Sequence, residues 1–176
     1  MRLTTLTLAL FPMAALAAGG GSPTPPTPSE TTKTCTDGLV WDIATQSCMT
    51  PEESTNDDSA RLDDVRELAY AGLYQAALDV LDTLDNPNAP LALTYYGFAH
   101  RNAGDVALGM SYYQAALTAD PNNLLARSYM GQGYVEAGDV VLARAQLTEI
   151  RMRGGRGTWA EASLADAIAT GTGYSY

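Results

Sequence analysis

An internal repeat is the feature of this sequence that most constrains its fold. The segment NAGDVALG begins at Asn102 and the segment EAGDVVLA begins at Glu136, so the two AGDV cores begin at Ala103 and Ala137. A period of about 20 to 50 residues is typical of chains that build one supersecondary unit per period and stack the units. We therefore expect several short units that pack against one another.

Helical periodicity dominates the first copy of the repeat. In residues 91–103, small or apolar residues recur three and four positions apart, as a helix with one buried side requires: Leu93, Tyr96, Gly97 and His100. Gly104 ends this helix, and Asp105 is placed to cap the next one, residues 106–119. Pro121 prevents the second helix from continuing, and Asn123 can cap the helix that follows. The pattern predicts a helix-turn-helix unit.

This unit resembles the tetratricopeptide repeat (TPR), a helix-turn-helix of about 34 residues, which is also the interval between Ala103 and Ala137. Its small, glycine, aromatic and proline positions are met at Gly97, Gly104, Gly109, Tyr113, Ala116 and Pro121. A shift by the same interval gives another copy at Gly131, Gly138, Ala143, Leu147 and Ile150, in which Gly154-Gly155 replaces the closing proline. A degenerate earlier copy covers Asp58 to Asp85, with Val65 at the small position, Gly72 at the turn, and Ala77, Leu81 and Leu84 expected on its second helix.

Small residues at these positions allow two antiparallel helices to come close together, while aromatic side chains such as Tyr113 fill the space between units. One pair of helices cannot bury its apolar side alone, so the units must stack. The segment 158–170 is expected to close the stack: Thr158 and Glu161 form a capping box, and the apolar side consists of Trp159, Leu164 and Ile168. The resemblance implies an all-α fold, a short right-handed solenoid of about three TPR units plus a capping helix in residues 58–170, with 171–176 as a tail.

The N-terminal residues 1–18 have the layout of a secretory signal peptide. Arg2 precedes an apolar run, and small residues around Ala17 and Ala18 offer a cleavage site. The run is shorter than the roughly 20 apolar residues of a membrane span. An uncleaved anchor is the alternative, but we expect a mature chain without a transmembrane span, located in the periplasm or secreted.

Residues 19–34 are rich in Gly, Pro and Thr and predict a disordered, extended linker. The next unit, residues 35–49, predicts a hairpin with strands at 39–41 and 46–49. We expect Cys35 and Cys48 to staple it with a disulfide, worth about 3 kcal/mol in the chain-entropy model. The alternative function of this unit is a ligand patch around Trp41, because the hairpin resembles the carbohydrate-binding loops of chitin-binding domains. Residues 50–57 predict an acidic hinge.

The charge balance and the reactive side chains argue against several functions. Twenty acidic against ten basic residues give a formal net charge of −10, which argues against a nucleic-acid partner. His100, the only histidine, is expected to be packed rather than catalytic, since no nucleophile is arranged beside it. We therefore expect neither an enzyme nor a cofactor.

Two further motifs have plainer interpretations than ligand sites. Residues 154–157 (GGRG) lack the Lys-Ser/Thr ending of a phosphate loop and predict a connector. The acidic residues Asp57, Asp58, Asp63 and Asp64 lack the spacing of a calcium loop. We expect them to form a solvated start of a helix, favoured by its dipole, with no metal ion bound.

The TPR resemblance also implies a concave face lined by the first helix of each unit. When the groove positions of the family are carried over by their place in the repeat, the partner groove would contain Arg66, Tyr70, Thr94, Phe98, Arg101, Asn102, Ser128, Gln132 and Glu136. Such a surface suits an extended peptide or a partner helix. The Lys/Asn/Arg carboxylate clamp of some family members is not matched, because Leu62, Tyr95, Leu125 and Tyr129 stand at four of its positions.

These observations give two hypotheses of function. The first is a non-catalytic interaction scaffold of the bacterial periplasm or envelope that binds a protein or peptide partner. The second is a cell-wall or carbohydrate-binding protein that uses Trp41. A weak head-to-tail self-association is a further prediction, in which Arg151, Arg153 and Arg156 would meet the acidic first unit of another copy.

Overall fold

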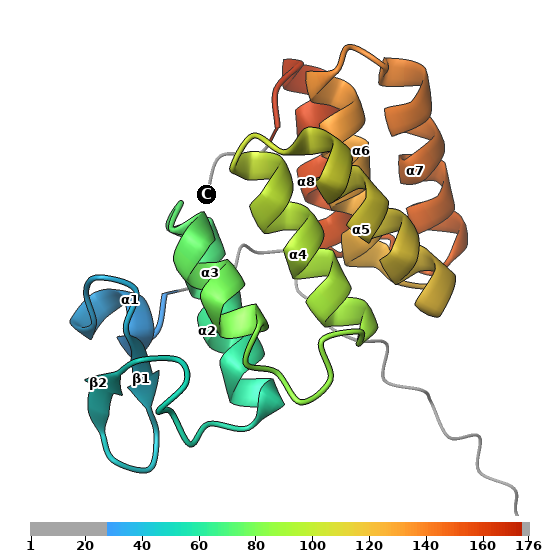
Figure 1. Cartoon of the computed structure of the whole chain (residues 1–176). Coiled ribbons are helices and arrows are strands. Elements are labelled where there is room, and N and C mark those ends of the chain that lie inside the picture. Colours follow the sequence, from blue (N-terminus) through green and yellow to red (C-terminus); the bar gives the residue numbers. More distant parts are fainter. Residues whose placement is uncertain (1–27, 174–176) are drawn as a thin grey trace, which may run out of the picture.

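The computed structural model describes residues 28–173. The predicted signal peptide, linker residues 19–27 and tail residues 174–176 lie outside the described residues. Within this range the chain forms eight helices and one two-stranded antiparallel sheet (Figure 1). Their bounds are α1 Glu30–Thr34, β1 Val40–Asp42, β2 Ser47–Met49, α2 Asp58–Tyr70, α3 Tyr74–Leu81, α4 Pro90–Asn102, α5 Val106–Ala119, α6 Leu124–Glu136, α7 Val140–Met152 and α8 Trp159–Thr170. The predicted, mainly helical fold is confirmed.

The helices pack as consecutive pairs. The closest packing is within α2/α3, α4/α5 and α6/α7, and α8 covers α6 and α7. Neighbouring pairs meet through α3 with α4 and α5 with α6, and the first helices of the pairs also touch, α2 with α4 and α4 with α6. Figure 1 shows the pairs following one another along the molecule, with the hairpin of β1 and β2 at the α2/α3 end.

Three glycines end the first helices of the pairs. Gly72, Gly104 and Gly138 have φ of 79°, 104° and 81°, the left-handed conformation in which any other side chain is strained. The predicted caps are confirmed, since Asp105 Oδ1 accepts from Leu108 N at 3.2 Å and Asn123 Oδ1 accepts from Ala126 N at 2.9 Å. The same local chemistry therefore makes the same turn at successive pairs.

Helices α4 and α5 come into backbone contact at their glycines. A Cβ placed on Gly109 would lie 2.7 Å from both the carbonyl oxygen of Gly97 and the backbone nitrogen of Arg101. A Cβ on Gly97 would lie 2.5 Å from the ring of Tyr113, which is fully buried. The predicted close approach of the two helices is confirmed for this pair.

The next pair uses its small residues differently. Gly131, the counterpart of Gly97, faces Leu164 of α8, whose side chain would lie 2.6 Å from an added Cβ. Ala143, the counterpart of Gly109, is fully buried. The α6/α7 pair thus leaves room for a methyl group, and Gly131 serves the packing of the C-terminal helix.

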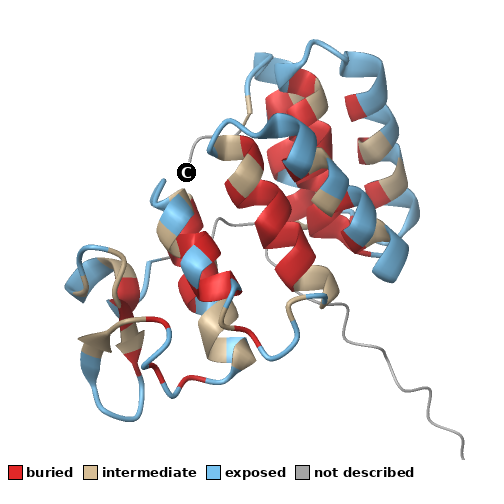
Figure 2. Ribbon diagram, in the orientation of Figure 1, coloured by how far each residue is buried: buried red, intermediate tan, exposed pale blue. Residues whose placement is uncertain are grey.

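Burial is concentrated in α4 and α6, as Figure 2 shows, while the outer sides of α5 and α7 are exposed. Both central helices are enclosed by the pairs on either side and by α8. The predicted apolar side of α8 is confirmed at Trp159 and Leu164, which are buried. In the first pair, α3 ends at Leu81, so Leu84 is buried but lies beyond the helix on which it was expected.

The N-terminal unit contains the predicted Cys35–Cys48 disulfide, with an S–S distance of 2.07 Å. Val40 pairs with Met49 and Asp42 with Ser47, so the first strand lies one residue later than predicted and includes Asp42, and the second is one residue shorter. The predicted linker is wrong at residues 30–34, which form α1. This short helix packs against α2 and β1, so tertiary contacts order a segment whose composition favours an extended chain.

Residues 50–57, predicted as an acidic hinge, make hydrogen bonds to the hairpin and to α2. Asp42 Oδ2 accepts from the backbone N of Thr55 at 2.6 Å and from its hydroxyl at 2.8 Å. Arg61 of α2 donates to the carbonyl oxygens of Asn56 and Ser54, both at 2.8 Å. The segment therefore fixes the hairpin to the start of α2.

The contact between α4 and α5 gives a stability prediction. We expect Gly109→Ala to lower the free energy of unfolding by about 1–3 kcal/mol, because the added methyl group meets backbone atoms that cannot rotate away. Chemical denaturation monitored by circular dichroism measures the change. Ala115→Ser, on the exposed side of the same helix, should change stability by no more than about 0.5 kcal/mol. Equal stability of the Gly109→Ala variant and the parent would contradict the close approach.

Candidate interaction surfaces

Three aromatic side chains connect the first helices of the three pairs. The ring of Phe98 on α4 lies 5.5 Å from that of Tyr70 on α2 and 4.8 Å from that of Tyr129 on α6, measured between centroids. The hydroxyl groups of Tyr70 and Tyr129 are hydrogen-bonded to each other. We call Tyr70, Phe98 and Tyr129 the inner aromatic cluster. It shows that α2 and α6 reach each other across α4.

Arg101 extends this cluster with a buried charge. Its guanidinium donates to Glu136 Oε2 at 2.7 Å and lies 6.0 Å from the centre of the Phe98 ring. Burial acts to lower the pKa of Arg101, but the nearby Tyr113 and Glu136 outweigh it and raise the pKa. Arg101 therefore remains charged while only 4% of the residue is exposed.

The structure divides the nine predicted groove residues into two sets. Buried are Thr94, Phe98, Arg101, Ser128 and Gln132, whereas Arg66, Tyr70 and Asn102 are half-buried and Glu136 is exposed. Their placement on the first helices follows the predicted phase. Their role in binding a partner stays a prediction.

Two buried members of the set join neighbouring helices. The hydroxyl of Thr94 donates to Pro90 O at 2.7 Å and accepts from Asn123 Nδ2 at 2.9 Å. The hydroxyl of Ser128 lies 3.0 Å from that of Ser163 on α8. Both groups thus hold the helices together. Tyr129, noted in the sequence only as a residue at an unmatched clamp position, was not expected to contact Tyr70 and Phe98, because its separations from both fit no repeat period.

His100 lies in a stack of aromatic rings. Its ring is 5.4 Å from that of Tyr112, with only 3° between their planes, and 6.4 Å from that of Tyr96. The hydroxyl of Tyr96 donates to Asp82 Oδ1 at 2.7 Å, which connects the stack to the preceding pair of helices. This placement agrees with the packed histidine predicted from the sequence.

A buried carboxylate lies where the N-terminal unit meets α2. Asp64 accepts hydrogen bonds from the hydroxyl of Thr31 and, at 3.2 Å, from Asn56 Nδ2. One turn along α2, Glu67 Oε2 accepts from the backbone N and the hydroxyl of Thr32, at 3.3 Å and 3.0 Å. Burial, with smaller contributions from the charges of Glu67 and Asp63, raises the pKa of Asp64 to about 6, although the two hydrogen bonds act to lower it.

The predicted solvated helix start is therefore wrong for Asp64. Asp57 does cap α2, because its Oδ1 accepts from Ala60 N at 3.0 Å, and Asp58 accepts from the backbone N of Asp85 at 2.9 Å. The Asp64 side chain instead contacts the N-terminal unit. The number of acidic residues in the sequence does not show which of their side chains are buried. By contrast, hydrogen bonds from Thr45 and Thr55 hold the pKa of Asp42 well below its usual range.

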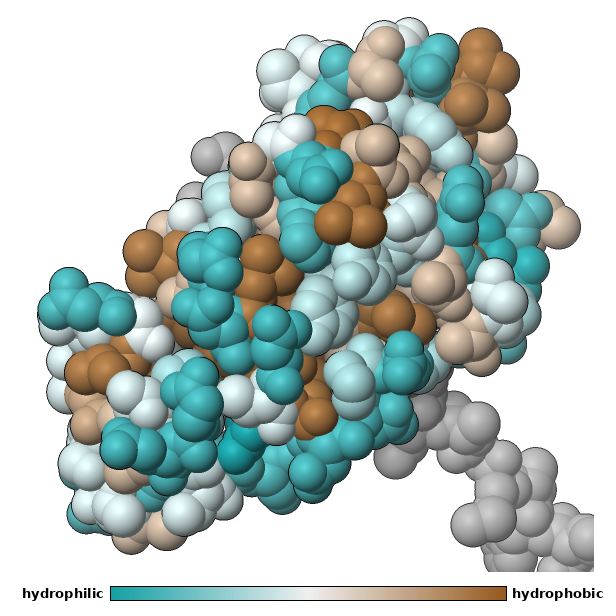
Figure 3. All heavy atoms as spheres, in the orientation of Figure 1, coloured by the Kyte–Doolittle hydropathy of each residue, from teal (hydrophilic) through white to brown (hydrophobic). Residues whose placement is uncertain are grey.

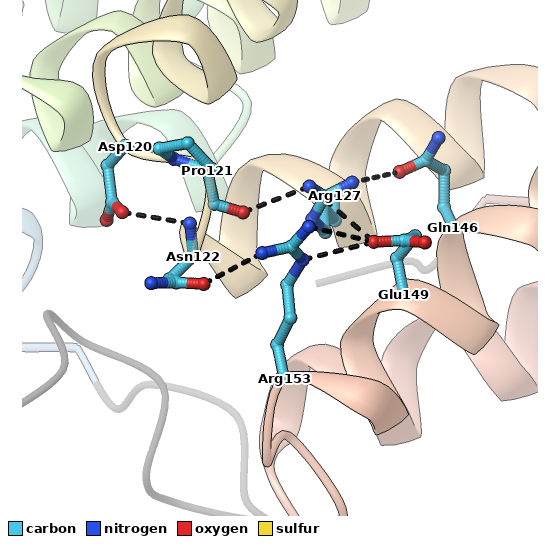
Figure 4. A network of polar contacts seen from close by, with 7 residues as sticks. All are labelled: Asp120, Pro121, Asn122, Arg127, Gln146, Glu149 and Arg153. Atoms are coloured by element: carbon cyan, nitrogen blue, oxygen red, sulfur yellow. Dashed lines mark hydrogen bonds and ion pairs between the residues drawn. The ribbon is translucent and has the colours of Figure 1, made fainter.

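A polar network connects the loop after α5 to α7 (Figure 4). Arg127 of α6 donates to Pro121 O at 2.9 Å and to Gln146 Oε1 at 3.1 Å. Arg153 forms an ion pair with Glu149 at 3.0 Å and donates to Asn122 Oδ1 at 2.8 Å. Burial, aided by the charge of Arg153, lowers the pKa of Arg127. The network therefore ties the loop that contains Pro121 to α6 and to the end of α7.

The predicted basic patch is partly neutralised within the chain. Arg151 Nε lies 2.6 Å from Glu161 Oε1, and Arg153 pairs with Glu149 as described above. Glu161 also accepts from Gly157 N at 2.7 Å, while Thr158 Oγ1 accepts from Glu161 N at 3.4 Å. The Glu161 side chain thus accepts from the backbone N of Gly157, one residue earlier than in the predicted capping box. Head-to-tail association through these arginines stays a prediction.

The hairpin has two different sides. Val40 and Asp42 are buried toward the rest of the protein, and successive side chains of a strand point to opposite faces. Trp41, which lies between them in the strand and is half-buried, therefore points to the other face. It lies next to the disulfide because it pairs with Cys48. Ile43, at the turn, is 63% exposed. This face is the candidate ligand patch.

In residues 28–173 no three His, Cys, Asp or Glu side chains gather in a way that could hold a metal ion. No helix within the same range has the length and hydropathy needed to cross a bilayer. Comparisons of the chain with protein-family models, with curated proteins and with solved structures found no match.

The environment of Asp64 gives a pH prediction. Because its pKa is about 6 in the folded state against an ordinary value of 3.8, the folded state binds a proton more readily than the unfolded state. The contribution of Asp64 to stability is complete below pH 3.8 and is lost as the pH rises through about 6. We expect the free energy of unfolding of the parent, relative to that of Asp64→Asn, to fall over this interval. Denaturation at a series of pH values measures it.

The exposed neighbour Asp63 provides the control for this measurement. Asp63→Asn should retain the pH dependence of the parent, apart from a small shift, because Asp63 acts on Asp64 only through space. Parallel curves for the parent and Asp64→Asn would show that Asp64 does not titrate in this interval.

Proposed function

We propose that the three helix pairs are TPR units of a short right-handed solenoid, and that the protein is a non-catalytic interaction scaffold. Its partner would be an extended peptide or a helix bound on the face formed by α2, α4 and α6. The observation that carries this proposal is the inner aromatic cluster, which connects these three helices and holds Arg101 with Glu136 beside it. A rigid base of this kind reduces the ordering cost of binding.

The accessible groups on these helices have the chemistry of a peptide site. Arg66, Tyr70 and Asn102 are half-buried and Glu136 is exposed, so parts of a phenol, an amide and charges of both signs reach the surface. Such groups bind the main chain and polar side chains of a peptide, while the aromatic base excludes water.

The compartment is part of the same proposal. The layout of residues 1–18 favours export to the periplasm or beyond. The Cys35–Cys48 disulfide supports this location, because disulfides persist in oxidising compartments and are rare in the cytosol. We infer that the partner is a protein or peptide of the bacterial envelope.

Site-specific photocrosslinking in the envelope tests the proposed surface. A photoreactive amino acid at Asn102 should capture a discrete partner that mass spectrometry can identify, because this residue lies at the accessible margin of the inner face. The same group at Gln114, exposed on α5, is the control and should capture none of that partner. Capture of one identical set of proteins from both positions, or none from Asn102, would refute the proposal.

The outward position of Trp41 favours a second candidate, a carbohydrate or cell-wall binding protein. A partly exposed indole beside a disulfide provides a flat apolar surface on which a sugar ring can stack.

If the hairpin binds carbohydrate, sedimentation with insoluble peptidoglycan or chitin should deplete the protein from solution, and Trp41→Ala should abolish the depletion. Ile43→Ala, at the exposed turn, is the matched control and should sediment like the parent. Without sedimentation of the parent, the scaffold remains the only candidate.

A further inference from the structure

Exposed aliphatic side chains gather at the beginnings of the second helices. Of the eight large apolar residues that are exposed in the described chain, six lie at the starts of α3, α5 and α7. We call these six residues the turn row: Leu73, Val106, Leu108, Val140, Val141 and Leu142. The most exposed member is Val141, at 81%, while Leu73 and Val106 are 47% and 48% exposed. The other two such residues, Ile43 and Met152, lie elsewhere.

The turn row has the register of the repeat. Val140 and Leu142 follow Val106 and Leu108 at the same interval that separates Ala137 from Ala103, and Leu73 precedes Val106 by almost this interval. Each group follows a glycine with positive φ, so the three turns share one geometry. In Figure 1 the turns lie along one edge of the stack, and Figure 3 shows hydrophobic atoms at the beginnings of α5 and α7 with hydrophilic atoms between them.

The conformation of the turns and the cap of α5 do not require aliphatic side chains at these positions. The glycines set the turn, and Asp105 caps α5 through Leu108 N. The side chain of Val141 is mostly in water, so it contributes little to the core. Exposed apolar groups in a regular arrangement are typical of surfaces that a partner covers.

The charges of the same edge indicate the kind of partner. Three exposed carboxylates, those of Asp105, Glu136 and Asp139, lie in or next to the turns that carry the row, against one exposed basic residue, Arg144 on α7. Apolar groups at intervals, flanked by carboxylates, are complementary to a helix with one aliphatic side and Lys or Arg at its margins. We propose that the turn row is a second docking surface, separate from the face of the inner aromatic cluster, and that its occupant is a basic amphipathic helix of another protein.

Two other occupants fit the charges less well. An anionic membrane would be repelled by a chain of net charge −10 whose turn row is itself flanked by carboxylates. A second copy would meet the row with its basic patch, in which Arg151 and Arg153 already pair with Glu161 and Glu149 and Arg156 is the remaining exposed member. Both alternatives are separate outcomes of the test.

Binding of designed peptides to the purified protein tests this proposal. The probe is a fluorescent Leu/Lys peptide that folds as an amphipathic helix, and its Leu/Glu counterpart has the same apolar side. Fluorescence anisotropy should show binding of the Lys peptide and none of the Glu peptide. Val106→Ser with Val141→Ser should weaken the binding at least about tenfold, because the apolar contact is lost.

The acidic residues and distant positions complete the test. Asp105→Asn with Asp139→Asn should weaken binding and reduce its dependence on salt, and asparagine at position 105 can still cap α5. Met152→Ser, at the far end of α7, and Asp166→Asn, exposed on α8, should bind like the parent. Thermal unfolding verifies that all variants remain folded.

Four results would overturn the proposal. Equal weakening by Asp166→Asn would show that binding depends on net charge alone, and equal weakening by Met152→Ser would show that any exposed apolar side chain serves. Binding to phosphatidylglycerol vesicles that is lost in Val106→Ser with Val141→Ser would identify a membrane as the occupant. Self-association in sedimentation velocity that the same variant abolishes would identify a second copy.

Discussion

The packing of the second and third helix pairs depends on the backbone contact of α4 with α5. Because Gly109 has no side chain, α5 lies directly on the backbone of Gly97 and Arg101. This approach brings the ring of Tyr113 over Gly97, where it is fully buried and lies 6.4 Å from the ring of Tyr129 on α6. The same contact sets the position of Arg101, whose side chain reaches Glu136 at the end of α6. One missing methyl group thus influences how two helix pairs stack and how the inner face is formed.

Features that rest on local chemistry could be predicted from the sequence. A glycine that follows an apolar-periodic segment indicated the turns at Gly104 and Gly138, and Asp105 and Asn123 cap helices through their own side chains. The disulfide followed from two cysteines in a chain with a signal-like start. Each of these depends on residues close together in the chain, so tertiary contacts did not have to be known. The period of the repeat then placed the first helices beside one another.

Features that depend on distant contacts could not be predicted. Residues 30–34 form α1 because Thr31 and Thr32 find carboxylate acceptors on α2, far along the chain. For the same reason Asp64 is buried, although its neighbour Asp63 is exposed. The candidate groove residues show the limit most clearly. Phase assigns Phe98 to the first helix of its unit, but only the approach of α2 and α6 across α4 decides that it is buried.

The contrast between the inner face and the turn row follows from how a repeat uses its sequence. On the inner face, side chains from three pairs converge, so the aromatic rings bury one another and the charge of Arg101 finds Glu136. The turns lie at the edge of the stack, and the same period leaves Val106 and Val140 partly exposed there. A repeat can therefore bury its first face by stacking alone, but no number of additional units would cover the turn row. Only a molecule that lies along the edge can remove these aliphatic groups from water, and the carboxylates of Asp105 and Asp139 favour a basic one.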